Sequence, residues 1–358
     1  MDAIRRTLKQ YRMPVDDEGY ICAVDPGDVA AIQACFDKYG VVVVGNVLTS
    51  SELTSSVAEV WSGLQSIDPT IDPSNPSTFA TPKWPPMHKM GILGSEPALT
   101  LQMCHNRQNL RLHSAFAAVF RTERLLVDIS RVGFMRPAGL NPTWGTMKNW
   151  LHLDMNPVTG LFSTVGFQAS NKCSNNSLLH TQGILALSDC PESVGGFHAV
   201  PGFHHVLREW SLLREDHCLN GGKSGNFGLA AKTHSDPTTV QIPQEDTAVW
   251  KNVQRMPIRK GSLLIWNNNV AHANFPSVSV DGVRIVQYIR MARADDEALR
   301  SRLFSSEEDL RIYLASLGDA ERILLQQSPA VSPVHVGQFP SDFAFTPVGR
   351  KLYGLDSW

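Results

Sequence analysis

The chain has 358 residues, of which 42% are hydrophobic and 18% are charged, and its formal net charge is −2. This composition is typical of a globular protein with a core, and the near-neutral charge gives no reason to expect nucleic acid or an anionic membrane surface as a partner. No segment approaches the roughly 18 consecutive apolar residues that a membrane helix needs. The length allows one large domain or two ordinary ones.

The amino terminus and the cysteines predict an intracellular, cytoplasmic protein. Residues 1–13 carry positive charges, but no apolar run follows them, so they do not resemble a secretory signal. The six cysteines are scattered and include no C-x-x-C pair. In a chain of this length, that pattern favours reduced thiols over a disulfide framework or a structural zinc site.

The first part of the chain is expected to be helical around one short strand. Asp28 is a candidate N-cap for a helix with an apolar face, and Gly40 is a candidate end for it. The four consecutive valines at 41–44 predict a buried strand.

A second helix and a loop follow in this part of the sequence. Thr49 or Ser50 would begin the helix, whose apolar residues recur with helical spacing as far as Leu64. Six prolines between residues 67 and 87 then predict a loop. We expect residues 1–120 to form an amino-terminal helical region that packs on the rest of the protein.

From about residue 125 the pattern changes to short apolar runs separated by Gly, Pro, Asn and Ser. The runs are LLVDISRVGFM, NWLHLDM, GILALSD, FHAVPG, AVWKNV, SLLIWN and VRIVQYIRM. Many short strands with such separators favour an all-β sandwich or barrel. We expect residues 121–294 to form this β core.

Three segments are expected to lie outside the strands. Residues 155–180 and 206–247 are each too long for a hairpin turn, and long loops in a compact domain are usually lids or binding loops. From residue 295 the pattern returns to helix, so residues 295–358 predict carboxy-terminal helices and a tail.

The segment NWLHLDMN carries the first candidate site. Side chains at positions i and i+2 of a strand share a face, so His152 and Asp154 would offer one imidazole and one carboxylate to the same ion. With a second histidine they would complete the facial triad that leaves coordination positions open on Fe(II). The spacing alone is weak evidence, since chance gives a His-x-Asp on the order of once in such a chain.

The sequence contains a second pair of this kind, His234 and Asp236, in a polar context followed at once by a proline. The third ligand candidate is His272, just after an apolar strand pattern. In a jelly roll, about four strands with turns separate the pair from the single histidine, and they need roughly 40 residues or more. The interval from Asp154 to His272 leaves ample room, whereas the interval from Asp236 barely does. The upstream pair is therefore preferred.

Arg284 lies on the predicted strand after His272. If 2-oxoglutarate binds a metal through its keto-acid end, its other carboxylate faces the protein, and Arg can hold a carboxylate with two parallel hydrogen bonds. The alternative is a surface arginine, like Arg290 or Arg293 nearby. Strand alternation by itself does not decide which face points inward.

The segment TQGILALSDCPESVGGFHAVPGFHH resembles the phytanoyl-CoA dioxygenase-like group of Fe(II)/2-oxoglutarate oxygenases. In that group a Gln-Gly opens a strand, a polar turn leads to Gly-Gly, and a Val-Pro-Gly-x-His turn follows. The segment DKYGVVVVGNVLTSSEL is similar to the amino-terminal helix–strand–helix of the family. The motif order is kept over about residues 36–292. Phe203 departs from the family, where many members have Ser, and the resemblance makes His204 and His205 turn residues.

The resemblance implies a mainly β protein with flanking helices, built on a double-stranded β-helix (jelly roll, cupin-like). It also implies a dioxygenase that uses Fe(II), 2-oxoglutarate and O₂ and hydroxylates a small molecule, releasing succinate and CO₂. Because relatives that halogenate lack the carboxylate, Asp154 favours hydroxylation or a related oxidation such as desaturation. The residues implied are His152, Asp154 and His272 as iron ligands, Arg284 as the 2-oxoglutarate anchor, and Gln182 and Lys148 as further cosubstrate contacts.

Two alternatives stay open. One is a cupin-like metalloenzyme that does not use 2-oxoglutarate, against which Arg284 argues. The other is a non-catalytic member of the fold that binds a small molecule, against which the complete triad argues. The sequence indicates neither the substrate nor the oligomeric state. Pocket candidates are Trp84, His88, Lys89 and Trp144, for which ordinary packing is the alternative.

Overall fold

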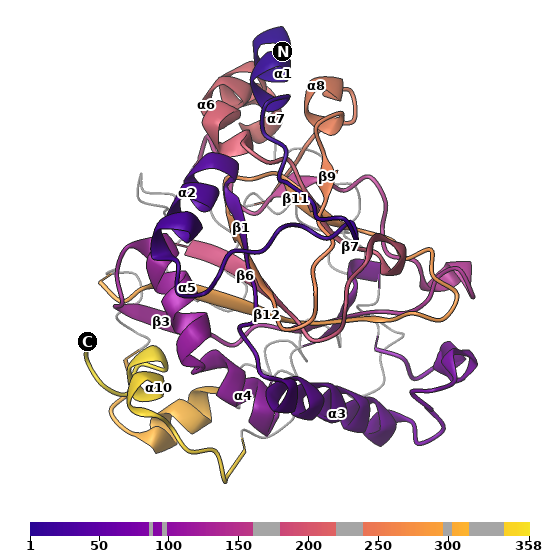
Figure 1. Cartoon of the computed structure of the whole chain (residues 1–358), viewed down its shortest axis with the longest axis vertical. Coiled ribbons are helices and arrows are strands. Elements are labelled where there is room, and N and C mark those ends of the chain that lie inside the picture. Colours follow the sequence, from indigo (N-terminus) through magenta and orange to yellow (C-terminus); the bar gives the residue numbers. More distant parts are fainter. Residues whose placement is uncertain (86–88, 95–98, 160–179, 220–238, 296–302, 315–339) are drawn as a thin grey trace.

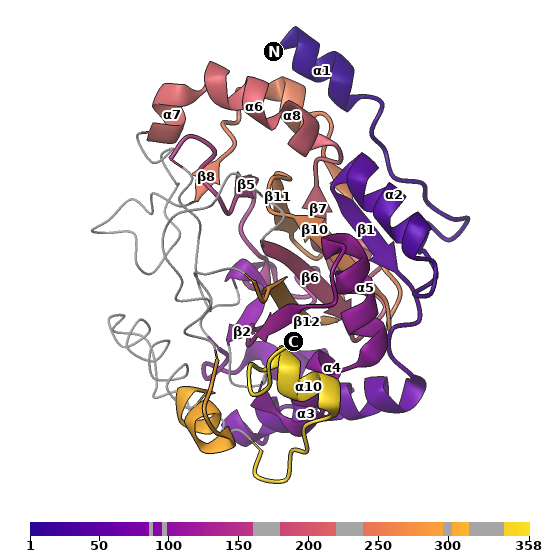
Figure 2. The same ribbon diagram turned by 90° about the vertical axis from the view of Figure 1, so that its left-hand side faces the viewer.

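The strands form two antiparallel sheets with helices outside them (Figures 1 and 2). The computed structural model describes the chain except residues 86–88, 95–98, 160–179, 220–238, 296–302 and 315–339. Together the two sheets make the predicted jelly roll with flanking helices. Within the described ranges, no helix combines the length and hydrophobicity that crossing a bilayer requires.

The larger sheet has the strand order β1-β10-β6-β12-β4-β2, and β3 also pairs with β12. Its strands are β1 (Val41–Val44), β2 (Ile92–Gly94), β3 (Leu125–Asp128), β4 (Val132–Met135), β6 (His180–Ala186), β10 (Leu263–Asn267) and β12 (Arg284–Arg293). Two of them, β1 and β2, come from the first 120 residues, so this part of the chain contributes to the sheet as well as covering it.

The smaller sheet has the strand order β8-β5-β11-β7-β9. Its strands are β5 (His152–Leu153), β7 (Gly196–Ala199), β8 (Val240–Gln241), β9 (Gln254–Arg255) and β11 (His272–Phe275). Residues of both sheets pack together in one buried cluster, in which the ring of Phe197 lies 4.8 Å from that of Trp266. The two sheets therefore face each other, and the space between them is the inside of the jelly roll.

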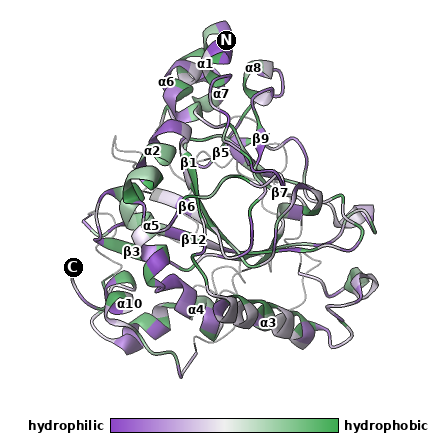
Figure 3. Ribbon diagram, viewed as in Figure 1, coloured by the Kyte–Doolittle hydropathy of each residue, from purple (hydrophilic) through white to green (hydrophobic). Residues whose placement is uncertain are grey.

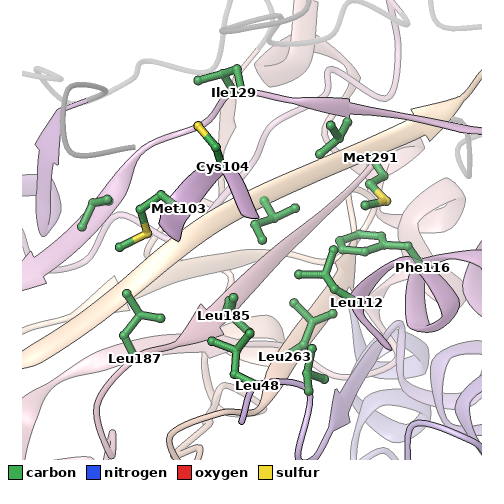
Figure 4. Packing of buried hydrophobic residues seen from close by; sticks show 14 of the residues in the cluster. Leu48, Met103, Cys104, Leu112, Phe116, Ile129, Leu185, Leu187, Leu263 and Met291 are labelled. Carbon is green, nitrogen blue, oxygen red and sulfur yellow. The ribbon is translucent and has the colours of Figure 1, made fainter. Parts of the chain in front are cut away.

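Helices cover the outer face of the larger sheet. They are α2 (Val29–Tyr39), α3 (Ser50–Ile67), α4 (Leu101–Arg107), α5 (Leu110–Phe120) and α10 (Pro347–Leu352). Figure 4 shows part of the contact, where Leu112 and Phe116 of α5 lie beside Leu185 of β6 and Leu263 of β10. Strand β1 is hydrophobic along its length, whereas the covering helices carry both hydrophobic and hydrophilic residues (Figure 3). The helices thus bury one stripe and expose the other.

A second group of helices gathers at one end of the molecule, around the amino terminus (Figure 2). It consists of α1 (Asp2–Leu8), α6 (Phe203–Leu213), α7 (Glu215–Leu219) and α8 (Thr247–Trp250). Their buried side chains, such as Leu8 and Trp210, form one cluster with Leu151 and Leu153 beside the smaller sheet. Short 3-10 helices occur at η1 (Pro76–Ala80), η4 (Pro142–Trp144) and η6 (Glu192–Val194).

The local signals in the first part of the chain are confirmed. The Asp28 side chain accepts a hydrogen bond from the backbone N–H of Ala31, and Gly40 ends α2 with a left-handed φ of 69°. Thr49 and Glu52 form a capping box at the start of α3. Such caps satisfy backbone groups that the helix itself leaves unpaired, and each contributes about 1 kcal/mol.

Two local predictions are wrong. The run AVWKNV, expected to be a strand, begins with helix α8. The segment 206–247, expected to be a loop, contains most of α6 and all of α7. In both cases packing against neighbouring helices decides the conformation, which a short apolar run cannot reveal. Residues 307–314 are helical as expected, whereas the second carboxy-terminal helix, AERILLQQ, lies outside the described residues.

A buried carboxylate lies at the start of helix α8. The Asp246 side chain, which is 0% exposed, accepts hydrogen bonds from Trp210 Nε1 at 2.8 Å and from the guanidinium of Arg214. Asp246 is also the residue that precedes the first turn of α8. This arrangement joins the end of α6 to the start of α8.

Asp246→Ala is expected to lower the free energy of unfolding by about 2–4 kcal/mol, because it leaves a buried indole N–H and a guanidinium without their acceptor. Urea unfolding followed by circular dichroism measures the loss. The matched control is Glu192→Ala, which removes an exposed carboxylate from Arg255 and should cost less than about 1 kcal/mol. Equal effects of the two substitutions would contradict the stabilising role of Asp246.

Candidate metal centre

Three side chains meet between the sheets. His152 lies on β5, Asp154 follows directly after this strand, and His272 begins β11. The antiparallel register places His152 and His272 opposite each other. The candidate ligand atoms of the three residues all lie within 4.8 Å of one another. The structure therefore brings together the three residues that the sequence analysis proposed as ligands.

The two imidazoles present the same ring nitrogen to the carboxylate. His152 Nε2 is 3.3 Å from Asp154 Oδ1, and His272 Nε2 is 3.4 Å from Asp154 Oδ2. On the other side of each ring, Nδ1 lies 2.9 Å from a backbone carbonyl, that of Trp150 for His152 and that of Val270 for His272. A carbonyl oxygen can only accept, so each Nδ1 carries the hydrogen. In the neutral ring this leaves the Nε2 lone pair free for a metal.

The Asp154 carboxyl is ionised. Burial raises its pKa, but His152 and His272, when both nitrogens of each ring carry hydrogen, outweigh burial through their hydrogen bonds and charges and hold this pKa well below its usual range. Two imidazole nitrogens and one carboxylate oxygen form the donor set that non-haem Fe(II) takes in the facial arrangement.

Aromatic rings fix the two histidines in place. The indole of Trp150 stacks on His152 with ring centroids 4.8 Å apart, and its Nε1 donates to the backbone carbonyl of Asn274 at 2.9 Å. On the other side, Phe197 and Trp266 pack against His272 at 5.7 and 5.2 Å. Such packing restricts ligand motion and keeps bulk water from the imidazoles.

Arg284 is buried at the start of β12, with 1% of its surface exposed. The next residue, Ile285, packs in the outer cluster and Val286 in the inner one, so Arg284 lies on the inner face of the sheet. Gly196, at φ 135°, lies so close that a Cβ there would be 3.0 Å from Arg284 Nε. The Gly-Gly of the sequence motif thus leaves room for this guanidinium.

One guanidinium nitrogen of Arg284, Nη1, is buried and has no hydrogen-bond partner among the described residues. A buried cationic donor without an acceptor is costly unless a ligand or water satisfies it. The chemistry that fits it is a carboxylate, which can accept from an arginine fork.

Further polar atoms without a partner in the described part of the chain lie on β11 of the smaller sheet and β10 of the larger one. Asn274 stands two residues after His272 and donates from Nδ2 to the hydroxyl of Tyr288 at 3.1 Å, while its Oδ1 is buried and unpaired. Trp266 Nε1 is also buried and unpaired. No sequence motif marks Trp266 or Asn274, although strand alternation from His272 indicates Asn274.

The two remaining cosubstrate contacts of the sequence analysis lie in different surroundings. Gln182, on β6, donates from Nε2 to Asp154 and to Asn268, and its Oε1 accepts from Arg290 Nε. Lys148 is exposed, and no hydrogen bond between described residues joins it to the three candidate ligands. A cosubstrate contact for either residue stays a prediction.

The described pocket candidates, Trp84, Trp144 and Lys89, contact residues outside the candidate metal centre. The rings of Trp84 and Trp144 lie 4.5 and 4.8 Å from the Arg136 guanidinium, so they hold a buried cation between them. Lys89 donates from Nζ to two backbone carbonyls of residues 143–145.

His204 and His205 each face one of the last carbonyls of α2 and thus act at a helix end. The rival pair His234 and Asp236 lies outside the described residues, as does His88.

The fold and the cluster define the class: a jelly-roll protein with a His-Asp-His set between its sheets. The family model "Phytanoyl-CoA dioxygenase (PhyH)" matches residues 166–286. A Dictyostelium discoideum protein named "Putative phytanoyl-CoA dioxygenase" is 24% identical over 321 residues, which cover 79% of this chain and 86% of that protein. These two matches confirm the relationship to the phytanoyl-CoA dioxygenases that the sequence motifs indicated.

Solved structures share the fold over nearly the whole chain. The "Putative Oxidoreductase" from Salmonella typhimurium LT2 aligns with a TM-score of 0.56 and 14% identity, covering 99% of this chain and 91% of that one. A hypothetical protein from Escherichia coli gives the same TM-score and identity, covering 99% and 90%. At this identity the likeness concerns the fold alone.

Proposed function

We propose that the protein is an Fe(II)- and 2-oxoglutarate-dependent dioxygenase that hydroxylates a small molecule and releases succinate and CO₂. The observation that carries this proposal is the buried His-Asp-His cluster, whose ligand atoms lie within 4.8 Å of one another, on a chain related to the phytanoyl-CoA dioxygenases. In this proposal His152, Asp154 and His272 hold the metal.

The residues fit an iron ion. Both imidazoles have their Nδ1 hydrogen committed to a backbone carbonyl, so neither needs to reorient in order to offer Nε2. The carboxylate is ionised and would balance one of the two metal charges. Three protein ligands leave the remaining coordination positions to the cosubstrate and O₂.

Arg284 fits the far carboxylate of 2-oxoglutarate. Its guanidinium lies on the inner face of the sheet that also carries Gln182, and its Nη1 has no acceptor in the described part of the chain. A dicarboxylic keto acid bound to the metal by one end would supply that acceptor with the other. The inner polar atoms of Asn274 and Trp266 are further candidates to contact it.

When bound, iron and 2-oxoglutarate supply the oxidising power, and the protein directs it. Trp150, Phe197 and Trp266 shield the two histidines from water. Holding reactants in a dry, fixed site favours the intended reaction over side reactions.

The test is succinate formation by purified protein reconstituted anaerobically with Fe(II) and then given 2-oxoglutarate and air. We expect binding of one Fe(II) per chain and slow iron-dependent turnover of 2-oxoglutarate even without a substrate. A chelator should stop this turnover, and added Fe(II) should restore it. Metal binding without succinate would favour a metalloenzyme that does not use 2-oxoglutarate, and the lack of metal binding would contradict the proposal.

A further inference from the structure

A chain of hydrogen bonds outside the three candidate ligands ends at Asp154. Arg290 on β12 donates from Nε to Oε1 of Gln182 on β6 at 2.9 Å. Gln182 donates from Nε2 to Asp154 Oδ2. We propose that Arg290 and Gln182 are positioning residues that hold the Asp154 carboxylate in its metal-binding orientation. This inference rests on the proposed function, since it concerns the same metal centre.

The arginine decides which way the glutamine amide points. An arginine N–H can only donate, so the atom of Gln182 that faces Arg290 has to be the carbonyl oxygen. The amide nitrogen then faces Asp154, to whose Oδ2 it donates a hydrogen bond. The opposite amide orientation would place oxygen against carboxylate and N–H₂ against guanidinium. Arg290 and Asp154 thus select the same orientation from the two ends of the amide.

Strand pairing fixes the amide in space. The antiparallel registers set Gln182 opposite Arg290 on one side and opposite Trp266 on the other. The second amide N–H donates at 3.2 Å to Oδ1 of Asn268, in the turn between β10 and β11 that leads to His272. Gln182 is 5% exposed and makes hydrogen bonds in three directions. A side chain held in this way is a rigid support for a ligand.

Asp154 needs such a support because it lies just beyond the end of β5. Its side chain is therefore positioned by its own contacts. One oxygen, Oδ2, accepts the amide hydrogen bond of Gln182, which restricts rotation of the carboxylate.

A competing explanation is that the Arg290 charge acts on Asp154 directly. Burial lowers the pKa of Arg290, and the charges of Asp154 and Asp128 act in the opposite direction. The two explanations differ in a double-mutant cycle. If Arg290 acts through Gln182, its removal has no further effect once Gln182 is gone, whereas a direct charge effect would persist.

The experiment measures the dissociation constant of cobalt(II), a redox-stable probe, for the full-length protein. Gln182→Ala is expected to weaken binding by about 10- to 100-fold, the usual cost of losing such a partner. Arg290→Met should weaken it less, and the double variant should match Gln182→Ala. The cobalt absorption spectrum should also change in Gln182→Ala, because a freed carboxylate alters the coordination.

The matched control is Gln254→Ala. Gln254 is also a buried glutamine on a strand, but both its hydrogen bonds go to the backbone of Met13. Its loss should lower stability and leave cobalt affinity and spectrum unchanged. Circular dichroism verifies that each variant is folded. If Gln182→Ala is unfolded, Gln182→Met keeps the side-chain volume without the amide.

Unchanged cobalt affinity and spectrum in a folded Gln182 variant would overturn the inference. So would additive losses in the double variant, which would assign the effect to the Arg290 charge itself. In either case succinate formation by the wild-type protein would leave the proposed function standing. A wild-type protein that binds neither cobalt nor iron would end both proposals together.

Discussion

His152→Ala, Asp154→Ala and His272→Ala are each expected to reduce iron-dependent succinate formation to background. Each substitution leaves two of the three ligands, and two donors neither hold the ion firmly nor complete the facial set. Metal affinity should fall by more than the roughly 10- to 100-fold that the loss of a supporting residue costs. Succinate assays and cobalt(II) titration measure the two effects. Wild-type turnover in any one of these variants would contradict the ligand assignment.

The control for this experiment uses the second His-x-Asp pair. The double variant His234→Ala, Asp236→Ala changes the same residue types at the same spacing. It should keep its metal and its succinate formation, because the compact cluster of described residues already contains a complete set of three ligands. If the double variant lost the metal and Asp154→Ala kept it, the metal site would have to be assigned to the downstream pair, His234 and Asp236.

Arg284→Ala is expected to raise the 2-oxoglutarate concentration required for turnover by on the order of 10²-fold or more. Removing one partner of a buried, charged, hydrogen-bonded pair costs roughly 2–5 kcal/mol of binding free energy. A change of about 1.4 kcal/mol corresponds to a factor of ten in affinity. The variant should still bind metal, because Arg284 is not among the three clustered ligands. The measurement is the 2-oxoglutarate dependence of succinate formation at saturating iron.

Two further variants make this test specific. Arg284→Lys should recover only part of the affinity, because an ammonium group is a point charge without the planar fork of arginine. Arg293→Ala, on the same strand, removes a surface guanidinium paired with Asp295 and should leave the dependence unchanged. An unchanged dependence in Arg284→Ala would mean that another basic residue anchors the cosubstrate.

The sequence could predict features that depend on neighbouring residues. Asp28, Gly40 and Thr49 mark helix ends because capping involves backbone groups within a few residues. Spacing suggested His152 and Asp154 as a pair, because alternate strand residues share a face, and the distance to His272 favoured this pair over His234 and Asp236. The motif order indicated the family, and the family match confirms that indication.

Local sequence patterns were insufficient where contacts between residues far apart in the chain decide the secondary structure. The run AVWKNV has the composition of a strand, yet it begins as helix α8, next to the buried Asp246 that is hydrogen-bonded to Trp210 and Arg214. Short apolar runs fit either structure, and tertiary packing chooses between them.

By itself the sequence determined the residue types, their local spacing and the ends of the early helices, all of which depend on interactions within a few residues. The tertiary structure decided that His272 lies opposite His152, that Arg284 faces inward, and that Arg290 reaches Asp154 through Gln182. These relations depend on the register of strands far apart in the chain, and a shift by one residue would turn each side chain to the other face. Register is set by packing over the whole sheet, so no local pattern contains it.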